Sequence, residues 1–204
     1  MSTVLVVCAH PDDESVGCGG TLRRHALDGE KIVAVFLTSG EGGGHGEPDH
    51  GATRMREARR AASILGISRV EFWGEPDGGL RVRRALAERL TALIEAVGAD
   101  LLYAPQPNDD HPDHRAAARL VRRAADGASR RPQIRWFEIW SPLPDMDEIV
   151  DISEVIAYKR RAIRAYRSQC EVMALDDAFV GLARYRGEMH SWPGGPYAEV
   201  FASG

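Results

Sequence analysis

Two short clusters of histidine and carboxylate residues contain the side chains best suited to chemistry in this sequence. The first contains His10, Asp12 and Asp13 and directly follows an apolar run that starts at Thr3. The second, Asp109–His114, also follows an apolar run. Imidazole and carboxylate groups bind divalent metals, transfer protons and stabilise developing charge. The clusters therefore indicate metal-assisted or acid–base chemistry.

Together the clusters hold enough ligands for a catalytic metal site. A catalytic zinc ion usually takes three protein ligands and leaves a further position for water or substrate. His10, Asp13 and one histidine of the second cluster would complete such a set. Either cluster alone is a weak signal, because His-x-x-Asp is more often a loop or cap and Asp-rich segments are usually solvated turns. Their pairing, each after a strand-like run, favours a metal site.

The segments before the clusters predict where these side chains lie. A β-branched run without alternation is typical of a strand buried on both faces. Pro11 lacks a backbone donor and ends the first run, and residues 100–104 form the run before the second cluster. Open α/β sheets bind ligands beyond the carboxyl ends of their strands. If both runs are central parallel strands, the two clusters share one rim of the sheet.

Strand-like and helix-like segments alternate along the chain. Beyond the first run, we predict strands at residues 31–38, 69–73, 100–104, 134–140, 149–152 and 197–201. The expected helices are one that ends near residue 27 and those at 53–65, 80–97, 113–125, 153–169 and 176–188. Successive strand–helix passages imply parallel strands joined by right-handed crossovers. We predict an α/β fold, with a Rossmann-like, doubly wound, mostly parallel sheet, helices on both faces, and a single domain over residues 1–204.

Two glycine-rich segments call for different interpretations. Gly17–Gly20 resembles a phosphate-binding loop, but a dinucleotide fingerprint needs a glycine where Leu22 stands, and the preceding aspartates would repel a pyrophosphate. We interpret these glycines as allowing close helix–sheet packing. Ser39–Gly51 is too rich in glycine and polar residues to pack in a core, so we predict a mobile substrate lid. His45 and His50 are expected to be exposed rather than metal ligands.

Composition restricts the class of protein. The net charge of −4 leaves no basic footprint for nucleic acid. Cys8, Cys18 and Cys170 are too few and too scattered for a disulfide framework or a cysteine zinc site, which predicts a reducing compartment. The N-terminal apolar run is short and has no positive segment before it, so neither a signal peptide nor a membrane span is expected. These features predict a cytoplasmic protein.

The two clusters also resemble the motifs of a known enzyme family. Ala9–Glu14 together with His111–His114 is similar to the motif pair of the LmbE-like or PIG-L family of zinc-dependent N-acetylglucosaminyl deacetylases. The resemblance continues at Arg54 and Glu57, Gly74–Gly78, Lys159, Ser168–Gln169 and Tyr197–Phe201. It implies a hydrolase that removes the acetyl group of an N-acetylated amino sugar or sugar-containing metabolite.

The resemblance also implies roles for individual residues. Zinc, or another divalent metal such as Fe²⁺, would be held by His10, Asp13 and His114. Asp12 would act as the general base. His111, oriented by Asp113, would stabilise the oxyanion and help to protonate the leaving amine. Glu14 would help to hold a ligand or the turn.

Recognition of the substrate is assigned to two further residues. Arg54 follows directly on the predicted lid, and Asp77 is by resemblance the carboxylate that family members aim at a sugar hydroxyl. The expected partner is a small N-acetylated sugar, with no nucleic acid, and assembly into a homo-oligomer remains open. One position departs from the pattern of some members, which carry a tyrosine where this chain has Asp109. An ionised acid cannot assist an oxyanion, so either His111 acts alone or the geometry differs.

Two alternatives remain open. The family also includes amidases that act on thiol-sugar conjugates, although at 204 residues this chain lacks the long insertions that would build an extended pocket. From a different class, the chain could be a non-catalytic nucleotide-binding or metal-binding module. The incomplete glycine fingerprint argues against the former. Retention of Asp12 and His111, which a simple metal site does not need, argues against the latter.

Overall fold

The computed structural model describes residues 2–43, 49–191 and 194–204. Its elements are, in chain order, β1 (Thr3–Cys8), α1 (Asp13–Leu27), β2 (Lys31–Thr38), α2 (His50–Leu65), β3 (Arg69–Glu75), α3 (Arg84–Val97), β4 (Leu101–Pro105), α4 (Pro112–Gly127), β5 (Gln133–Phe137), β6 (Glu148–Asp151), the 3-10 turn η1 (Ser153–Val155), α5 (Ile156–Ala165), α6 (Arg167–Cys170), α7 (Leu175–His190) and β7 (Ala198–Ser203). Among these ranges, no helix has the length and apolar character needed to cross a bilayer.

β1 lies at the centre of the sheet, and the chain winds away from it in both directions. In the described residues, seven strands form a sheet in the order β3-β2-β1-β4-β5-β7-β6. The strands from β3 to β5 are parallel, and β7 pairs antiparallel with β5 and β6. The strand order reverses between β1 and β4, the point at which doubly wound sheets bind ligands. The predicted fold class is confirmed, and both clusters lie on the same rim.

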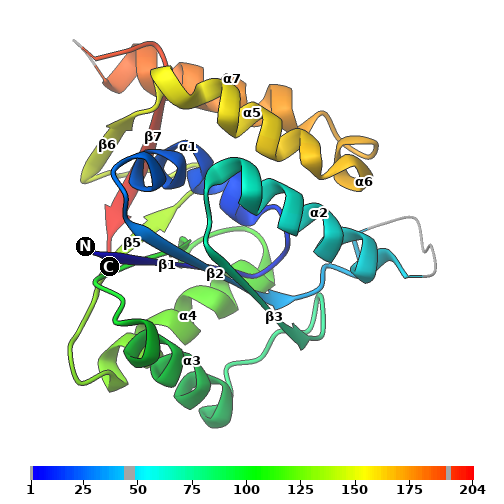
Figure 1. The fold of residues 1–204 in the computed structure, drawn as a ribbon, viewed down its shortest axis with the longest axis vertical. Coiled ribbons are helices and arrows are strands. Elements are labelled where there is room, and N and C mark those ends of the chain that lie inside the picture. Colours follow the sequence, from blue (N-terminus) through cyan, green and yellow to red (C-terminus); the bar gives the residue numbers. More distant parts are fainter. Residues whose placement is uncertain (1, 44–48, 192–193) are drawn as a thin grey trace.

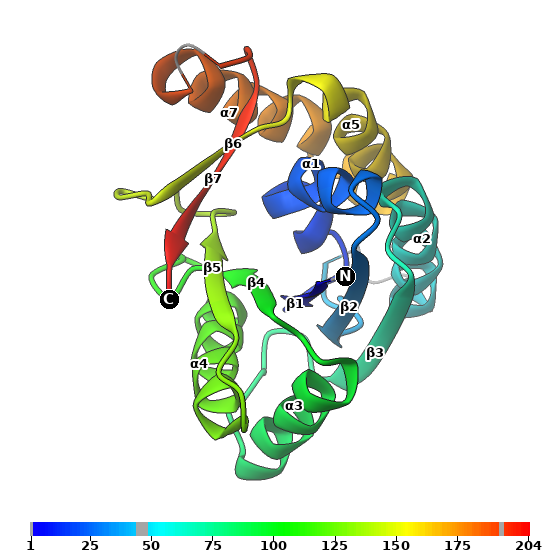
Figure 2. The ribbon, with the colours of Figure 1, turned by 60° about the vertical axis from the view of Figure 1, so that its left-hand side comes forward.

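Helices cover both faces of the sheet (Figure 1). Helices α3 and α4 lie on one face, and α1 and α2 lie on the other, with α5 and α7 packed outside them (Figure 2). The side chains of β1 alternate between the two layers, with Leu5 and Val7 in one core cluster and Val4 and Val6 in the other. Because both faces are covered, β1 is buried throughout, which explains its uninterrupted apolar run.

The glycines after the first cluster let α1 approach its neighbours closely. A Cβ atom on Gly17 would lie 2.3 Å from the Phe137 ring of β5, and one on Gly20 would lie 2.7 Å from Ile152. No larger residue fits at either position without movement of the neighbour. The interpretation of Gly17 and Gly20 as packing positions is confirmed.

Some boundaries differ from the predicted ones because loop backbone groups bind side chains of the site. Helix α3 begins at Arg84 rather than residue 80, since the Leu80 N–H donates to the Asp113 carboxylate. Strand β5 ends at Phe137, and the Trp140 N–H then donates to Asp109 instead of to a strand. The helix predicted at 153–169 is divided into η1, α5 and α6. At the second division, the non-helical Tyr166 directs its hydroxyl to Glu14.

The segment predicted as a lid is only partly described. Residues 44–48, with His45, lie outside the described residues, and the mobility of the lid stays a prediction. Helix α2 begins at His50, earlier than predicted. The expectation that His50 is exposed was wrong: its ring is buried, with Nε2 3.3 Å from the Gln169 side-chain amide.

Candidate active site

Three side chains from the two clusters direct ligand atoms toward one point beyond β1 and β4. The Nδ1 atom of His10 lies 3.2 Å from Nε2 of His114. The Oδ1 atom of Asp13 lies 3.2 Å from that Nε2 and 3.9 Å from that Nδ1. Ligand atoms about 2.0–2.1 Å from a tetrahedral zinc ion are separated by roughly 3.3 Å. The spacing fits a single divalent metal ion.

Hydrogen bonds to the opposite atom of each side chain fix its orientation. Nε2 of His10 faces Asp77 and Asp113 at 3.0 and 3.3 Å, so in the neutral ring this nitrogen carries the proton and Nδ1 keeps its lone pair. Nδ1 of His114 faces Asp109 at 3.0 Å, so in the neutral ring Nδ1 carries the proton and Nε2 keeps the lone pair that faces His10 and Asp13. Carboxylates behind metal-ligating histidines commonly select the tautomer in this way.

The charges around the two histidines change their proton affinity in the same direction. Burial of His10 disfavours its charged form, but Asp113 and Asp77 outweigh burial and raise the pKa of His10 to about 10. Burial of His114 is likewise outweighed by Asp13 and Asp109, which raise the pKa of His114 to about 9. Burial by itself would raise the pKa of Asp13, but its interactions with His114 and His10 outweigh burial and lower that pKa. A divalent cation would replace these protons and interact with the same carboxylates.

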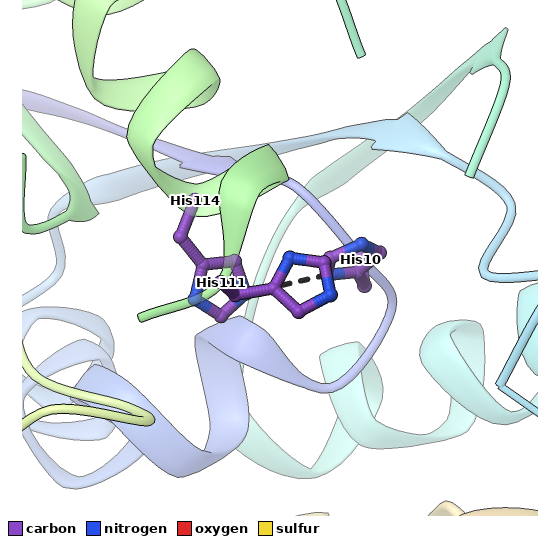
Figure 3. A group of neighbouring side chains, drawn as sticks. All are labelled: His10, His111 and His114. Atoms are coloured by element: carbon purple, nitrogen blue, oxygen red, sulfur yellow. Dashed lines mark hydrogen bonds between the residues drawn. The ribbon is translucent and has the colours of Figure 1, made fainter. Parts of the chain in front are cut away.

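His111 lies beside the three converging atoms but is oriented for a different task (Figure 3). Its ring centroid is 4.7 Å from that of His10 and 4.9 Å from that of His114, so these three histidines also form a possible metal-binding group. However, Nδ1 of His111 accepts a hydrogen bond from the Asp113 backbone N–H at 3.2 Å. The neutral ring therefore carries its proton on Nε2, which makes it a donor. Burial and the two neighbouring histidines lower the pKa of His111.

The hydrogen bond between Asp113 and His111 is made by the backbone N–H of Asp113, not by its carboxylate. Its carboxylate accepts from Gly78 N–H at 2.7 Å and from Leu80 N–H at 3.1 Å, and it faces Nε2 of His10. The expected orientation of His111 by Asp113 thus takes place through the main chain. The Asp113 side chain instead orients His10 and holds the loop after β3.

Asp12 occupies a strained position between the converging atoms and Arg54. Its φ of 122° is unusual for a residue with a side chain, and such strain is often found at functional sites. A guanidinium nitrogen of Arg54 lies 2.7 Å from Oδ2 of Asp12. Burial raises the pKa of Asp12 to about 6, despite the opposing effect of Arg54. A carboxylate with such a pKa is well matched to accept a proton near neutral pH.

Glu14 supports this turn from inside the protein. It accepts hydrogen bonds from the hydroxyls of Ser15 and Tyr166, both at 2.7 Å, and its Oε2 lies 3.3 Å from the Asp12 backbone nitrogen. Burial raises the pKa of Glu14 to about 7. Tyr166, on the segment after α5, was not identified from the sequence.

Arg54 and Asp77 line the cavity and also contact Asp12 and His10, respectively. Arg54 is buried and donates to the Pro11 and Gly40 carbonyls as well as to Asp12. Asp77 accepts from the Gly42 N–H at 2.8 Å while its other oxygen faces His10. Both residues therefore connect the segment after β2 to the two ends of the first cluster.

Asp109 has a role that the sequence did not reveal. One oxygen accepts from His114 and the His111 N–H, and the other accepts from the Trp140 and Ser141 N–H groups. Both oxygens of this buried carboxylate are therefore occupied, one of them by His114, and Asp109 does not line the cavity. A metal-ligating histidine usually has a carboxylate or carbonyl partner on its other nitrogen. An aspartate in the same cluster as His114 could therefore have suggested this role.

These groups line a cavity of about 460 Å³, a size typical of sites for small molecules. His10, Asp12, Asp13, Arg54, Asp77 and His111 contribute to its walls, and His114 lies behind them. The structure thus brings together every site residue predicted from the sequence.

Comparison with known proteins identifies the family to which this arrangement belongs. The PIG-L family, described as GlcNAc-PI de-N-acetylase, matches residues 5–125, a range that includes both clusters. The chain belongs to the PIG-L family. The recognition made from the two motifs is therefore confirmed.

Individual relatives of this PIG-L protein include deacetylases. A probable N-acetyl-α-D-glucosaminyl L-malate deacetylase 2 of Bacillus cereus is 31% identical over 189 residues, which cover 85% of this chain and 86% of that protein. The structure of N,N'-diacetylchitobiose deacetylase from Pyrococcus horikoshii is similar with a TM-score of 0.85 and 25% identity, covering 100% of this chain and 84% of that one.

One structural relative of this PIG-L protein has a different reaction in its name. The 4-carboxy-2-hydroxymuconate hydratase of Pseudomonas putida has a TM-score of 0.86 and 26% identity, covering 100% of this chain and 96% of its own. The fold therefore does not specify the reaction, and the side chains of the site must be used to infer it.

Proposed function

We propose that this protein is a metal-dependent hydrolase that removes the acetyl group from an N-acetylated amino sugar or sugar-containing metabolite. The observation that carries the proposal is the convergence of ligand atoms from His10, Asp13 and His114 beside Asp12 and His111 in one cavity. We propose zinc as the metal, with Fe²⁺ as the alternative. When bound, such an ion supplies Lewis-acid polarisation of an amide carbonyl and acidifies water.

Proton transfer is the task of Asp12 and His111. Asp12 accepts the proton of the attacking water, because its partly buried carboxylate lines the cavity beside Asp13 and is held by Arg54. His111 presents an Nε2–H group to the developing oxyanion and afterwards donates to the leaving amine, which departs poorly unless protonated. Asp113 keeps this tautomer through its backbone N–H.

Substrate hydroxyl groups would lie near Arg54, as its place after the predicted lid suggested, and near Asp77, as the resemblance implied. Both side chains reach the cavity and offer charge-assisted hydrogen bonds, which orient a polar substrate. In addition, their contacts with Asp12 and His10 make each of them a support for the reacting groups.

Metal content and product release test the proposal together. The purified protein is analysed for metal and assayed for free amine and acetate with a panel of N-acetylated sugars. His10→Ala and His114→Ala should lose stoichiometric metal, whereas His111→Ala should retain metal and lose activity. Equal metal content in His114→Ala and wild type would contradict the ligand assignment.

The remaining alternatives give different results in the same experiment. Cleavage of a thiol-sugar amide without acetate release would indicate the amidase. A stoichiometric metal with no turnover of any amide would indicate a non-catalytic metal-binding module.

A further inference from the structure

The cavity has two chemically different sides. Arg54, Asp77, Gln169 and the backbone of Gly42 and Gly43 form a polar side. The remaining apolar residues of the lining form what we name the apolar wall, which consists of Val16, Ile139, Trp140, Met173, Leu175, Ala178 and Phe179. Hydroxyl groups placed against such a surface lose water without gaining hydrogen bonds. A free monosaccharide would therefore use only one side of the cavity.

The apolar wall is anchored in the core of the protein. Val16 and Leu175 are buried in a cluster with Ile163, and Ile139 and Phe179 pack against that cluster. A wall with such support keeps its shape when a ligand binds.

Backbone N–H groups of the apolar wall are also hydrogen-bonded to residues of the reaction centre. The Val16 N–H donates to the Asp12 carbonyl at 3.0 Å. The Trp140 N–H donates to Asp109 at 3.0 Å, and the other oxygen of Asp109 holds His114. A group lying along the wall would thus extend directly from the reaction centre.

At the outer end, large apolar side chains are open to water. Trp140 is 53% exposed, Met173 is 41% exposed, and the adjoining Val172 is 48% exposed. Large apolar side chains that gather at the mouth of a cavity are typical of a surface that contacts a ligand.

We propose that the physiological substrate carries an apolar substituent on its N-acylated amino sugar, and that this group lies against the apolar wall while the hydroxyl groups face Arg54, Asp77 and Gln169. The proposal rests on the proposed function. The apolar group is either an aglycone or an acyl chain longer than acetyl, since both place hydrocarbon beside the same amide.

Two series of substrates distinguish an apolar aglycone from a longer acyl chain. The methyl, butyl and hexyl glycosides of N-acetylglucosamine extend the aglycone, and N-acetyl-, N-butanoyl- and N-hexanoylglucosamine extend the acyl group. Each methylene group that is fully buried should raise kcat/KM by about fourfold. We expect kcat/KM to rise at least about tenfold along one series and to remain flat along the other.

Variants of the wall provide the matched control. Met173→Ser and Phe179→Ala should reduce the dependence on chain length. Met189→Ser, at the other end of α7 and 62% exposed but outside the cavity lining, should leave that dependence unchanged. Binding of the same compounds, measured by calorimetry, gives a readout that does not require turnover.

The outcomes separate this inference from the proposed function. If neither affinity nor kcat/KM changes with chain length in either series, the proposal of an apolar substituent is overturned, even if acetate is released. A dimer that Met173→Ser dissociates, without any effect of chain length, overturns it too, because the wall would then be a contact between copies. Chain-length-dependent binding without hydrolysis supports the apolar substituent and contradicts only the proposed reaction.

Discussion

Asp109 and Asp110 are neighbours in the chain, but their side chains lie in different environments. The Asp109 carboxylate is buried and accepts hydrogen bonds from His114, His111 and the loop after β5, while Asp110 is exposed. A carboxylate that holds the distal nitrogen of a metal ligand fixes its tautomer and strengthens it as a ligand. This pair therefore tests whether Asp109 supports the metal site.

We predict that Asp109→Asn lowers metal affinity by about 10- to 100-fold. The amide keeps the size of the side chain, but it cannot accept from both His114 and the Trp140 N–H. Titration of the protein with zinc in competition with a chelator measures the change. Asp110→Asn is the control and should bind metal like wild type; an equal affinity for both variants would contradict the role of Asp109.

A second prediction at this scale concerns the proposed base. Asp12→Asn removes the proton acceptor and keeps the shape, so kcat should fall by about 10²-fold or more while metal content is retained. Steady-state kinetics and metal analysis on the same preparation check both parts. Turnover near the wild-type value would transfer the role elsewhere, with Glu14 as the next candidate.

At the scale of elements, α1 consists of two helical segments that meet at Cys18, whose φ of −142° is not helical. The Lys159 ammonium donates to the Val16 carbonyl at 2.6 Å, at the end of the first segment. Glu199 accepts from the Gly20 and Thr21 N–H groups at 2.9 and 2.7 Å, at the start of the second. Each charge complements the dipole of the segment it caps. The Lys159–Glu199 pair thus stabilises the kink in the helix that begins at Asp13.

We predict that Lys159→Met destabilises the fold by about 3–5 kcal/mol, because it leaves the Glu199 carboxylate buried without its partner. The two side chains form a pair at 2.6 Å and are almost completely buried. Urea unfolding measures the free energy of unfolding. The double variant Lys159→Met/Glu199→Gln should recover part of the loss, since no uncompensated charge remains.

The exposed pair of Arg184 and Glu188 on α7 is the matched control. Arg184→Met should change stability by less than about 1 kcal/mol, because surface ion pairs contribute little. If Lys159→Met lowered the free energy of unfolding no more than Arg184→Met does, the buried pair would not stabilise the kink in α1.

At the scale of the whole molecule, the site joins two parts of the sheet. His10 and Asp13 follow β1, and His114 belongs to α4 after β4. The polar pairs across this junction include His10 Nε2 with Asp113 and His114 Nε2 with Asp13. A metal bound between them would connect elements that are far apart in the chain but adjacent at the strand-order reversal. That a single domain contains all of residues 1–204 remains a prediction, which one cooperative transition would support.

We predict that zinc at a thousand times its dissociation constant stabilises the fold by about 4 kcal/mol. For a chain of this length, such a gain raises Tm by about 8–16 °C, and a chelator should reverse it. Calorimetry with and without zinc measures the shift. The rise of Tm on adding zinc should persist in His111→Ala and be lost in His114→Ala. A rise in His114→Ala equal to that of wild type would exclude this residue as a ligand.

The sequence by itself determined those properties that depend on near neighbours. The unbroken run of β1 predicted a strand buried on both faces, and Pro11 marked where it ends. The order of strands and helices predicted the doubly wound sheet, whose polar rim then followed from the parallel direction of β1 and β4. The two motifs predicted the family, which is confirmed, and the resemblance to that family supplied the ligands and the base, which remain proposals.

Only the tertiary structure decided how these side chains meet, because their contacts join residues far apart in the chain. His10 and His114 are 104 positions apart, and their tautomers depend on Asp77 after β3, on Asp109 after β4 and on Asp113 in the first turn of α4. The sequence showed Asp109 only as a departure from a pattern, since nothing local indicates that it faces His114. The apolar wall was likewise hidden: it combines α1, the loop after β5 and α7, and the packing of these elements determines which side of the cavity is apolar.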